Sequence, residues 1–206
     1  MGEDRGVKWT RAVHHVESLA QSCADTATRP SSIFALRVTQ LWVAGDLLGP
    51  PRDLELITVA LCVDLPVDQV AWLSEPTGTQ HWASATRLTK NPVLPWWRSV
   101  HAPVWNHRID RPAMLWDDAT GICQDTLSAL RDGRGESVRL PAPEPDALTA
   151  RLRDELRVSL GALHACSIAY EDQRWRPGKL EPVADALYRA SAGYLDVLDA
   201  IGHPGA

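Results

Sequence analysis

The apolar positions at the start of the chain recur every three or four residues, the spacing that places side chains on one face of a helix. This repeat extends over residues 8–27 and stops before Arg29 and Pro30, which favour a break. The apolar face comprises Trp9, Val13, Val16, Ala20, Cys23 and Ala27. The pattern predicts an amphipathic helix.

Three later segments have the composition of β-strands. Residues 33–43 are rich in β-branched and aromatic side chains, and we expect them to form a strand that runs into Gly45 and Asp46. Residues 53–63 form an apolar run without helical spacing, which indicates an interior strand covered on both faces. Residues 113–116 predict a further strand.

Short helices are predicted between and after these strands. We expect them over residues 64–73, 79–88 and 122–131, the last of them ending at Gly133. Residues 91–112 contain four prolines, so we expect extended segments and ordered loops there. Strands and helices therefore alternate along this part of the chain.

From residue 139 the sequence pattern changes from alternating strands and helices to a proline-rich segment followed by helices. Residues 139–145 contain alternate prolines and predict an extended linker, and two long amphipathic patterns follow, starting at Asp146 and covering 181–201. We predict an α/β fold with a small mixed sheet flanked by helices and a C-terminal helical hairpin. Residues 1–138 would form the α/β lobe, and residues 139–206 the linker and the hairpin packed on it as one compact unit.

Composition narrows the class of protein. The 206 residues are 45% hydrophobic and 23% charged, which suits one globular domain with a core. The formal charge of −5 provides no overall field that attracts nucleic acid, so nucleic acid is not favoured as a partner. No apolar run reaches the length of a membrane span, and the first ten residues lack the pattern of a secretory signal. We therefore expect a cytoplasmic protein without a membrane partner.

The strongest candidate for chemistry is the stretch GDLLGPPRDLEL over residues 45–56. Side chains two residues apart on a strand point to the same face, so Asp53 and Glu55 are spaced to share a hard cation such as Mg²⁺. The same two acids also suit an ordinary strand entrance exposed to solvent, where Arg52 would pair with a nearby acid. Both interpretations stay open at this point.

This stretch resembles the nucleotidyltransferase motif of the polymerase β superfamily. The resemblance implies that Gly45 forms the turn after a strand, and that Asp53, Glu55 and Asp117 are catalytic carboxylates that bind Mg²⁺. The chain departs from the family pattern in three ways. Asp46 stands where the family has a serine, Glu55 replaces an aspartate, and the segment between the glycine and the carboxylates is short.

The same resemblance implies a nucleotide-binding function. The residues expected around the nucleotide and its phosphates are Gly45, Asp46, Gly49, Arg98, Arg174 and Lys179. The resulting hypothesis is a nucleotidyltransferase-like protein that carries out Mg²⁺-dependent nucleotide binding or nucleotidyl transfer, or a degenerate member of that fold.

A second hypothesis rests on tryptophan. The chain contains nine tryptophans and one phenylalanine, and Trp96, Trp97 and Trp105 lie in proline-rich segments beside cationic residues. Flat rings next to cations are suited to gripping a peptide. This pattern indicates a non-catalytic protein-interaction or regulatory module that uses tryptophan-rich loops and a protein partner.

The chain as a whole resembles an uncharacterised family of actinobacterial proteins of similar length. The stretches that carry this resemblance are GDLLGPPRDLELITVALCVDLP, WLSEP, WRSVHAPVWNHRI and RWRPGKLEPVADALYRAS. This resemblance implies a shared fold and no particular activity.

Overall fold

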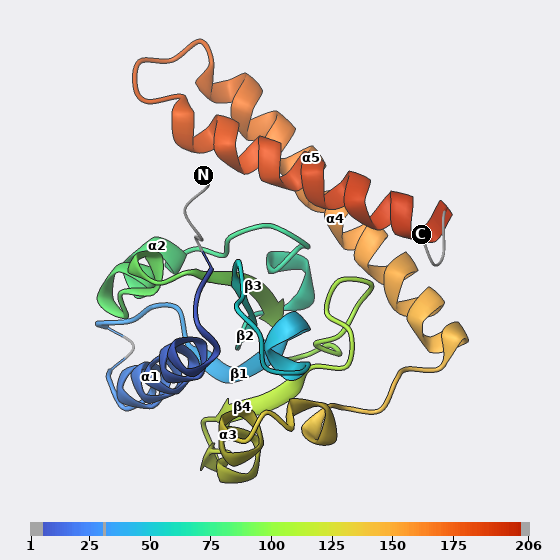
Figure 1. Cartoon of the computed structure of the whole chain (residues 1–206). Helices are drawn as coiled ribbons and strands as arrows, with labels where there is room; N and C mark the ends of the chain where they lie inside the picture. The colour runs from blue at the N-terminus through green and yellow to red at the C-terminus, as the bar shows by residue number, and fades with distance from the viewer. Residues whose placement is uncertain (1–5, 31, 203–206) are drawn as a thin grey trace, which may run out of the picture.

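The computed structural model describes residues 6–30 and 32–202 and contains a five-stranded mixed sheet (Figure 1). The order of the strands across the sheet is β3-β2-β1-β4-β5. Their bounds are β1 (Val38–Ala44), β2 (Ile57–Val63), β3 (Val93–Ser99), β4 (Ala113–Asp117) and β5 (Gly121–Ile122). The prediction of a small mixed α/β sheet is therefore confirmed.

Strand directions determine which loops meet at each end of the sheet. β1 is antiparallel to both β2 and β4, and β2 is parallel to β3. Thr58 at the start of β2 pairs with Ala44 at the end of β1, and Ala113 at the start of β4 pairs with Val43. The end of β1 and the starts of β2, β3 and β4 consequently lie at the same end of the sheet, which we call the Ala44 end.

Five α-helices lie within the described residues, together with four short 3₁₀ turns. The helices are α1 (Trp9–Ala27), α2 (Thr79–Ala85), α3 (Gln124–Arg131), α4 (Pro145–Gln173) and α5 (Glu181–Gly202). The 3₁₀ turns are η1 (Gly45–Leu48), η2 (Val67–Gln69), η3 (Leu88–Lys90) and η4 (Gly135–Val138).

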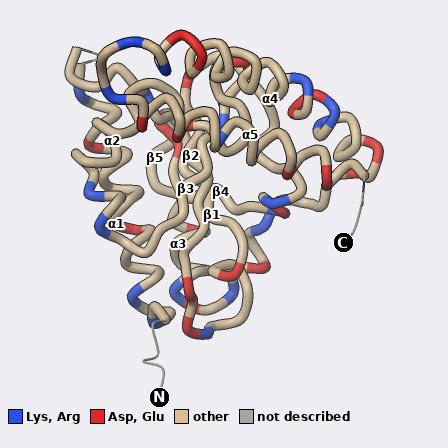
Figure 2. Tube along the Cα trace, turned by 90° about the horizontal axis from the view of Figure 1, so that it is seen from above, with Lys and Arg blue, Asp and Glu red and all other residues tan. Residues whose placement is uncertain are grey.

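The sheet separates two hydrophobic clusters because alternate residues of a strand point to opposite faces. Leu41 of β1 and Val59 of β2 lie in the larger cluster with residues of α1, α2 and α3. Trp42 and Ala60, one residue further along each strand, lie in the second cluster with residues of α4 and α5. Figure 2 shows the strands between α1 and α2 on one side and α4 and α5 on the other.

The C-terminal hairpin extends beyond the body of the protein (Figure 1). The buried residues of α4 are Leu152, Glu155 and Ser159, all in its first half, and those of α5 are Ala190, Gly193 and Val197. The hairpin is therefore anchored over only part of its length, and the turn between its helices lies away from the sheet.

Five element predictions differ from the structure by more than one residue. Two of them differ only at a helix end, because α2 stops at Ala85 rather than at 88 and α3 begins at Gln124 rather than at 122. Residues 33–37 precede β1 and form turns, in which the amide of Ile33 donates to the carbonyl of Pro30. Residues 53–56 precede β2, because Leu54 forms an isolated bridge with Val7 rather than continuing the sheet. Residues 64–73 contain only the three-residue η2 in place of a helix.

Charge and hydropathy add little to this architecture. Figure 2 shows acidic and basic residues interspersed along the trace. Within residues 6–30 and 32–202, no helix combines the length and the apolar character that crossing a membrane requires.

Candidate functional site

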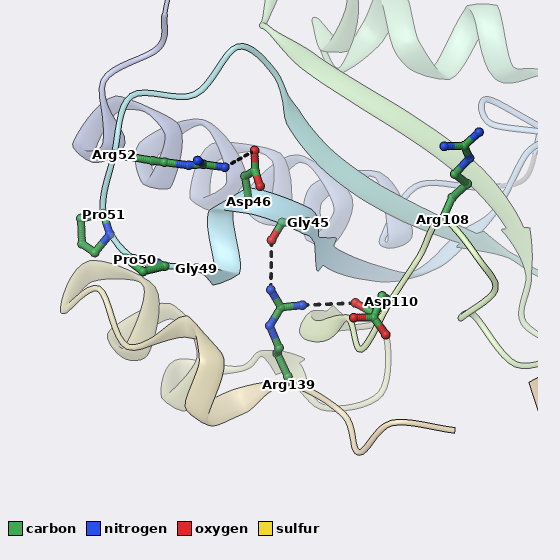
Figure 3. Close-up of a pocket in the computed structure, with 9 residues that line it drawn as sticks. All are labelled: Gly45, Asp46, Gly49, Pro50, Pro51, Arg52, Arg108, Asp110 and Arg139. Carbon is green, nitrogen blue, oxygen red and sulfur yellow. Dashed lines mark hydrogen bonds and ion pairs between the residues drawn. The ribbon is translucent and has the colours of Figure 1, made fainter. Parts of the chain in front are cut away.

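A pocket of about 430 Å³ opens at the Ala44 end of the sheet (Figure 3). We call it the strand-end pocket. It is lined by Gly45, Asp46, Gly49, Pro50, Pro51, Arg52, Arg108, Asp110 and Arg139. Gly45, Asp46 and Gly49, which the sequence placed near a nucleotide, lie together in this pocket.

Separate segments supply its walls. β1 ends at Ala44, and Gly45 turns the chain with φ of +67°, a conformation that a side chain disfavours. The chain then continues through η1 to the segment 49–52. Arg108 and Asp110 come from the segment before β4, and Arg139 follows η4. The pocket forms because β4 pairs with β1 and thereby brings these distant segments together.

Hydrogen bonds hold the floor of the pocket. Arg139 donates to the carbonyl oxygens of Gly45 at 3.3 Å and Asp110 at 3.2 Å (Figure 3). Its side chain is only 12% exposed. Its two hydrogen bonds join two walls of the pocket. At the mouth, the guanidinium of Arg52 lies 2.7 Å from the carboxylate of Asp46, and both side chains are 63% exposed. The pair at the mouth is therefore far more accessible than Arg139.

Arg108 links the pocket to α5. Its Nε donates to the carboxylate of Asp196 at 3.1 Å, and the indole of Trp72 and Nε2 of His107 each lie 2.7 Å from the same carboxylate. Burial raises the pKa of Asp196, but the hydrogen bonds from Arg108, Trp72 and His107 outweigh burial and lower this pKa to about 2. Asp196 is therefore ionised at neutral pH and holds Arg108 in place.

The structure does not bring the three predicted metal ligands together. Asp53 and Glu55 are exposed and precede β2 at the Ala44 end. Asp117 is the last residue of β4 and pairs with Gln40, near the start of β1, so it lies at the opposite end of the sheet. Within the described ranges, no group of three or more histidine, cysteine or acidic side chains is placed to hold a metal ion.

Asp117 has a structural role at its end of the sheet. One carboxylate oxygen accepts hydrogen bonds from the amides of Ala119 at 3.0 Å and Thr120 at 3.3 Å, which closes the turn between β4 and β5. The other oxygen accepts a hydrogen bond from Gln40 at 3.1 Å. The carboxylate that terminates a strand in the sequence thus completes a turn in the structure.

The predicted phosphate-binding cations lie outside the strand-end pocket. Arg98 of β3 is buried and pairs with Glu155 of α4. Arg174 and Lys179 lie in the exposed turn between α4 and α5, where Arg174 pairs with Glu171 at 2.9 Å. The cations that line the pocket are instead Arg52, Arg108 and Arg139.

Sequence reasoning missed most of these pocket residues. Arg52 lies inside the stretch 45–56, and its predicted pairing with a nearby acid is confirmed by its contact with Asp46, but its place in a pocket was not predicted. Arg108, Asp110 and Arg139 lie far along the chain, and their proximity depends on the pairing of β4 with β1. The sequence signal for Arg52 is its place immediately after a predicted turn at a strand end.

The tryptophans proposed as a recognition surface are packed within the protein. Trp97 is 5% exposed and packs edge-on against Trp82, with ring centres 5.7 Å apart. Trp96 is half-buried and lies 5.5 Å from Trp72 between ring centres, on the other face of the sheet. Trp105 is also half-buried. These three rings therefore form no single exposed patch.

Comparison with known proteins provides a family and no assigned activity. No curated protein and no solved structure matches the chain. The family model described as a domain of unknown function, DUF7711, matches residues 7–203. The chain therefore belongs to the DUF7711 family.

Proposed function

We propose that the strand-end pocket binds the phosphate groups of a nucleotide. The observation that carries this proposal is the exposed guanidinium of Arg52, which lies in one pocket with the Gly45–Gly49 turn, and Arg108 and Arg139 also line that pocket. Guanidinium groups bind phosphate oxygens through two parallel hydrogen bonds, which makes arginine well suited to this ligand.

The charge of the pocket supports an anionic ligand. Three arginines and two aspartates line the pocket, a formal charge of +1 for the lining itself. Arg108 also pairs with Asp196 and Arg139 with Glu136 outside the lining, so Arg52, whose partner Asp46 is exposed, is the cation that an anionic ligand would bind. Arg52 and Asp46 are both well exposed, and an exposed ion pair contributes only about 0–1 kcal/mol. A phosphate can therefore displace Asp46 from Arg52 at little cost, whereas Arg139 maintains the floor.

The residues present do not fit a two-metal centre for nucleotidyl transfer. Asp117 lies at the far end of the sheet from Asp53 and Glu55, and Asp46 pairs with Arg52. The proposal is accordingly nucleotide binding by a degenerate nucleotidyltransferase-like chain, with no transfer step assigned to these carboxylates.

The test is a thermal unfolding series with ATP, GTP, CTP and UTP, each with and without Mg²⁺. A ligand at 100 times its Kd stabilises the folded state by about 2.7 kcal/mol, which raises Tm by several degrees. We expect at least one nucleotide to stabilise the protein without Mg²⁺, and Arg52→Gln to reduce that shift.

Arg134→Gln is the matched control for Arg52→Gln. Arg134 is also 63% exposed and also pairs with an aspartate, Asp132, at 2.7 Å, but it does not line the pocket. An equal loss in both variants, or no shift with any nucleotide, would contradict the proposal. A shift that requires Mg²⁺ and disappears in Asp53→Asn/Glu55→Gln would instead favour a metal site at those carboxylates.

A further inference from the structure

A second group of charged residues is buried between the sheet and α4. Glu155 accepts hydrogen bonds from Arg98 and from Asn106, and its carboxylate lies 2.9 Å from the guanidinium of Arg151. The side chains of Arg98, Arg151 and Glu155 are only 2%, 9% and 4% exposed. Two guanidinium groups therefore share one carboxylate in a region with little water.

Arg98 and Arg151 carry two positive charges, and Glu155 supplies only one buried negative charge. Arginine does not release its proton in proteins, and a buried charge without compensation is unfavourable by several kcal/mol. The Nε groups of both Arg98 and Arg151 are buried and lack a hydrogen-bond partner within the described residues. Burial and the neighbouring Arg98 lower the pKa of Arg151, as expected for a cation in such surroundings.

Arg151 also lines a cavity of about 740 Å³ between α4, η2 and the segment 101–105, which we call the α4 cavity. The rest of the lining combines apolar residues, among them Val67, Pro103, Trp105 and Val158, with the polar or charged residues Asp68, His101, Asp154 and Arg157. The volume lies within the range of sites for small organic ligands. None of the residues of the strand-end pocket lines this cavity.

Arg151 shares Glu155 with Arg98, and the other charged residues of the cavity lining have partners of their own or lie exposed. Asp154 pairs with Arg157 at 3.0 Å, and both side chains are more than 60% exposed. His101 pairs with Asp64 at 3.0 Å. Asp68 also lines the cavity and lies on η2, and its side chain is in no ion pair within the described residues. The two acidic residues that line the cavity, Asp68 and Asp154, are therefore exposed to solvent, whereas the side chain of Arg151 on α4 is buried.

We propose that the α4 cavity binds a small organic anion whose carboxylate pairs with Arg151 and whose flat apolar body packs against Trp105. Such a ligand supplies the missing negative charge and buries apolar surface in the same step. This site is separate from the nucleotide pocket and does not depend on the function proposed for it.

Isothermal titration calorimetry with two probes of the same shape tests the charge requirement. Naphthalene-2-carboxylate carries the anion, and naphthalene-2-carboxamide is its neutral equivalent. We expect the full-length protein to bind the carboxylate and to bind the carboxamide at least about tenfold more weakly, since a charge-assisted hydrogen bond is lost. Equal affinity for both probes, or binding of neither, would overturn the proposal.

Arg151→Met tests the assignment to this cation. The substitution retains an apolar side chain of similar length and leaves Glu155 paired with Arg98, so we expect the variant to fold and to lose carboxylate binding by about tenfold or more. Arg153→Met is the control, because Arg153 is exposed on the same helix and does not line the cavity. Undiminished binding by Arg151→Met, or an equal loss in Arg153→Met, would also overturn the proposal.

A second pair of variants keeps the test decisive if Arg151→Met does not fold. Ala150 is exposed and lines the cavity beside Arg151. Ala150→Glu places a carboxylate there, and Ala150→Gln places a neutral side chain of equal size, so we expect Ala150→Glu to bind naphthalene-2-carboxylate more weakly than Ala150→Gln does. Equal binding by these two variants would show that the excess positive charge does not select the ligand.

Discussion

Asp196 connects α5 to the rest of the protein through hydrogen bonds to its carboxylate. It is bound by Trp72, His107 and Arg108, which all lie outside the hairpin, and its side chain is 18% exposed. Hydrogen bonds to a charged group are stronger than those between neutral groups. The attachment of the C-terminal helix therefore depends on the ionised form of this residue.

Stability should depend on pH through Asp196. Its pKa is lowered from 3.8 to about 2 in the folded protein, so its contribution of about 2 kcal/mol is present above pH 4 and is lost as the pH falls from about 4 to about 2. Urea unfolding of the wild type and of Asp196→Asn over this range measures the difference. We expect the difference to be largest near neutral pH and to shrink towards pH 2.

Asp199→Asn is the control for that series. Asp199 is exposed on the same helix, so its replacement should leave the free energy of unfolding nearly unchanged at every pH. A wild-type advantage over Asp196→Asn that does not change with pH would contradict the assigned role of the carboxylate.

At the scale of residues, the sequence predicted the part of the site that is continuous in the chain. Gly45, Asp46 and Gly49 lie within five positions of one another, and a turn after a strand brings such neighbours together. Arg139 and Asp117 are different cases, because their places depend on which strands pair and in which direction. An aspartate at the end of a predicted strand, such as Asp117, does not show at which end of the sheet that residue lies.

Two glycines of the hairpin differ in how closely other atoms approach them. A Cβ at Gly193 of α5 would lie 2.1 Å from the carbonyl oxygen of Trp72, whereas a Cβ at Gly161 of α4 would meet nothing within 4 Å. Gly193 therefore allows the close approach of α5 to the body, and Gly161 carries no such constraint.

Alanine substitution at these two glycines should have effects of opposite sign. We expect Gly193→Ala to lower the free energy of unfolding by about 1–3 kcal/mol, because backbone atoms must move apart. Gly161→Ala should raise it by up to about 1 kcal/mol, because alanine favours the helix more than glycine does. Urea unfolding followed by circular dichroism measures both, and destabilisation by Gly161→Ala as large as that by Gly193→Ala would contradict this packing.

At the scale of elements, the long helices were predicted more accurately than the short helices and than the starts of the first two strands. The apolar spacing placed the first helix over 8–27 and the last over 181–201, against α1 at Trp9–Ala27 and α5 at Glu181–Gly202. The strand predicted over 53–63 begins only at Ile57, because the preceding segment pairs with Val7. β-Branched composition identifies an extended segment but not the partner that makes it part of a sheet.

The whole molecule depends on contacts that cross from the sheet to the hairpin. Arg98 belongs to β3, and its partner Glu155 belongs to α4, so their buried ion pair joins the two parts. Removal of one member of a buried pair leaves the other charge unpaired and commonly destabilises a protein by about 3–5 kcal/mol.

Glu155→Ala should therefore destabilise the protein by about 3–5 kcal/mol in urea unfolding followed by tryptophan fluorescence. The substitution leaves both Arg98 and Arg151 buried without a carboxylate. Glu171→Ala, which removes an exposed pair with Arg174, should cost no more than about 1 kcal/mol. Similar losses in the two variants would show that the buried pair does not hold the hairpin.

The two margins of the sheet affect how copies of this chain behave at high concentration. An exposed strand edge can recruit a strand from another molecule and begin aggregation. Here one margin is β3, which contains Pro95 and so lacks one amide donor, and the other is β5, which is only two residues long. Pro95 interrupts the ladder that a new strand would need at the first margin, and the second margin is too short to serve as a template, so the sheet is protected against edge-to-edge polymerisation without closing into a barrel.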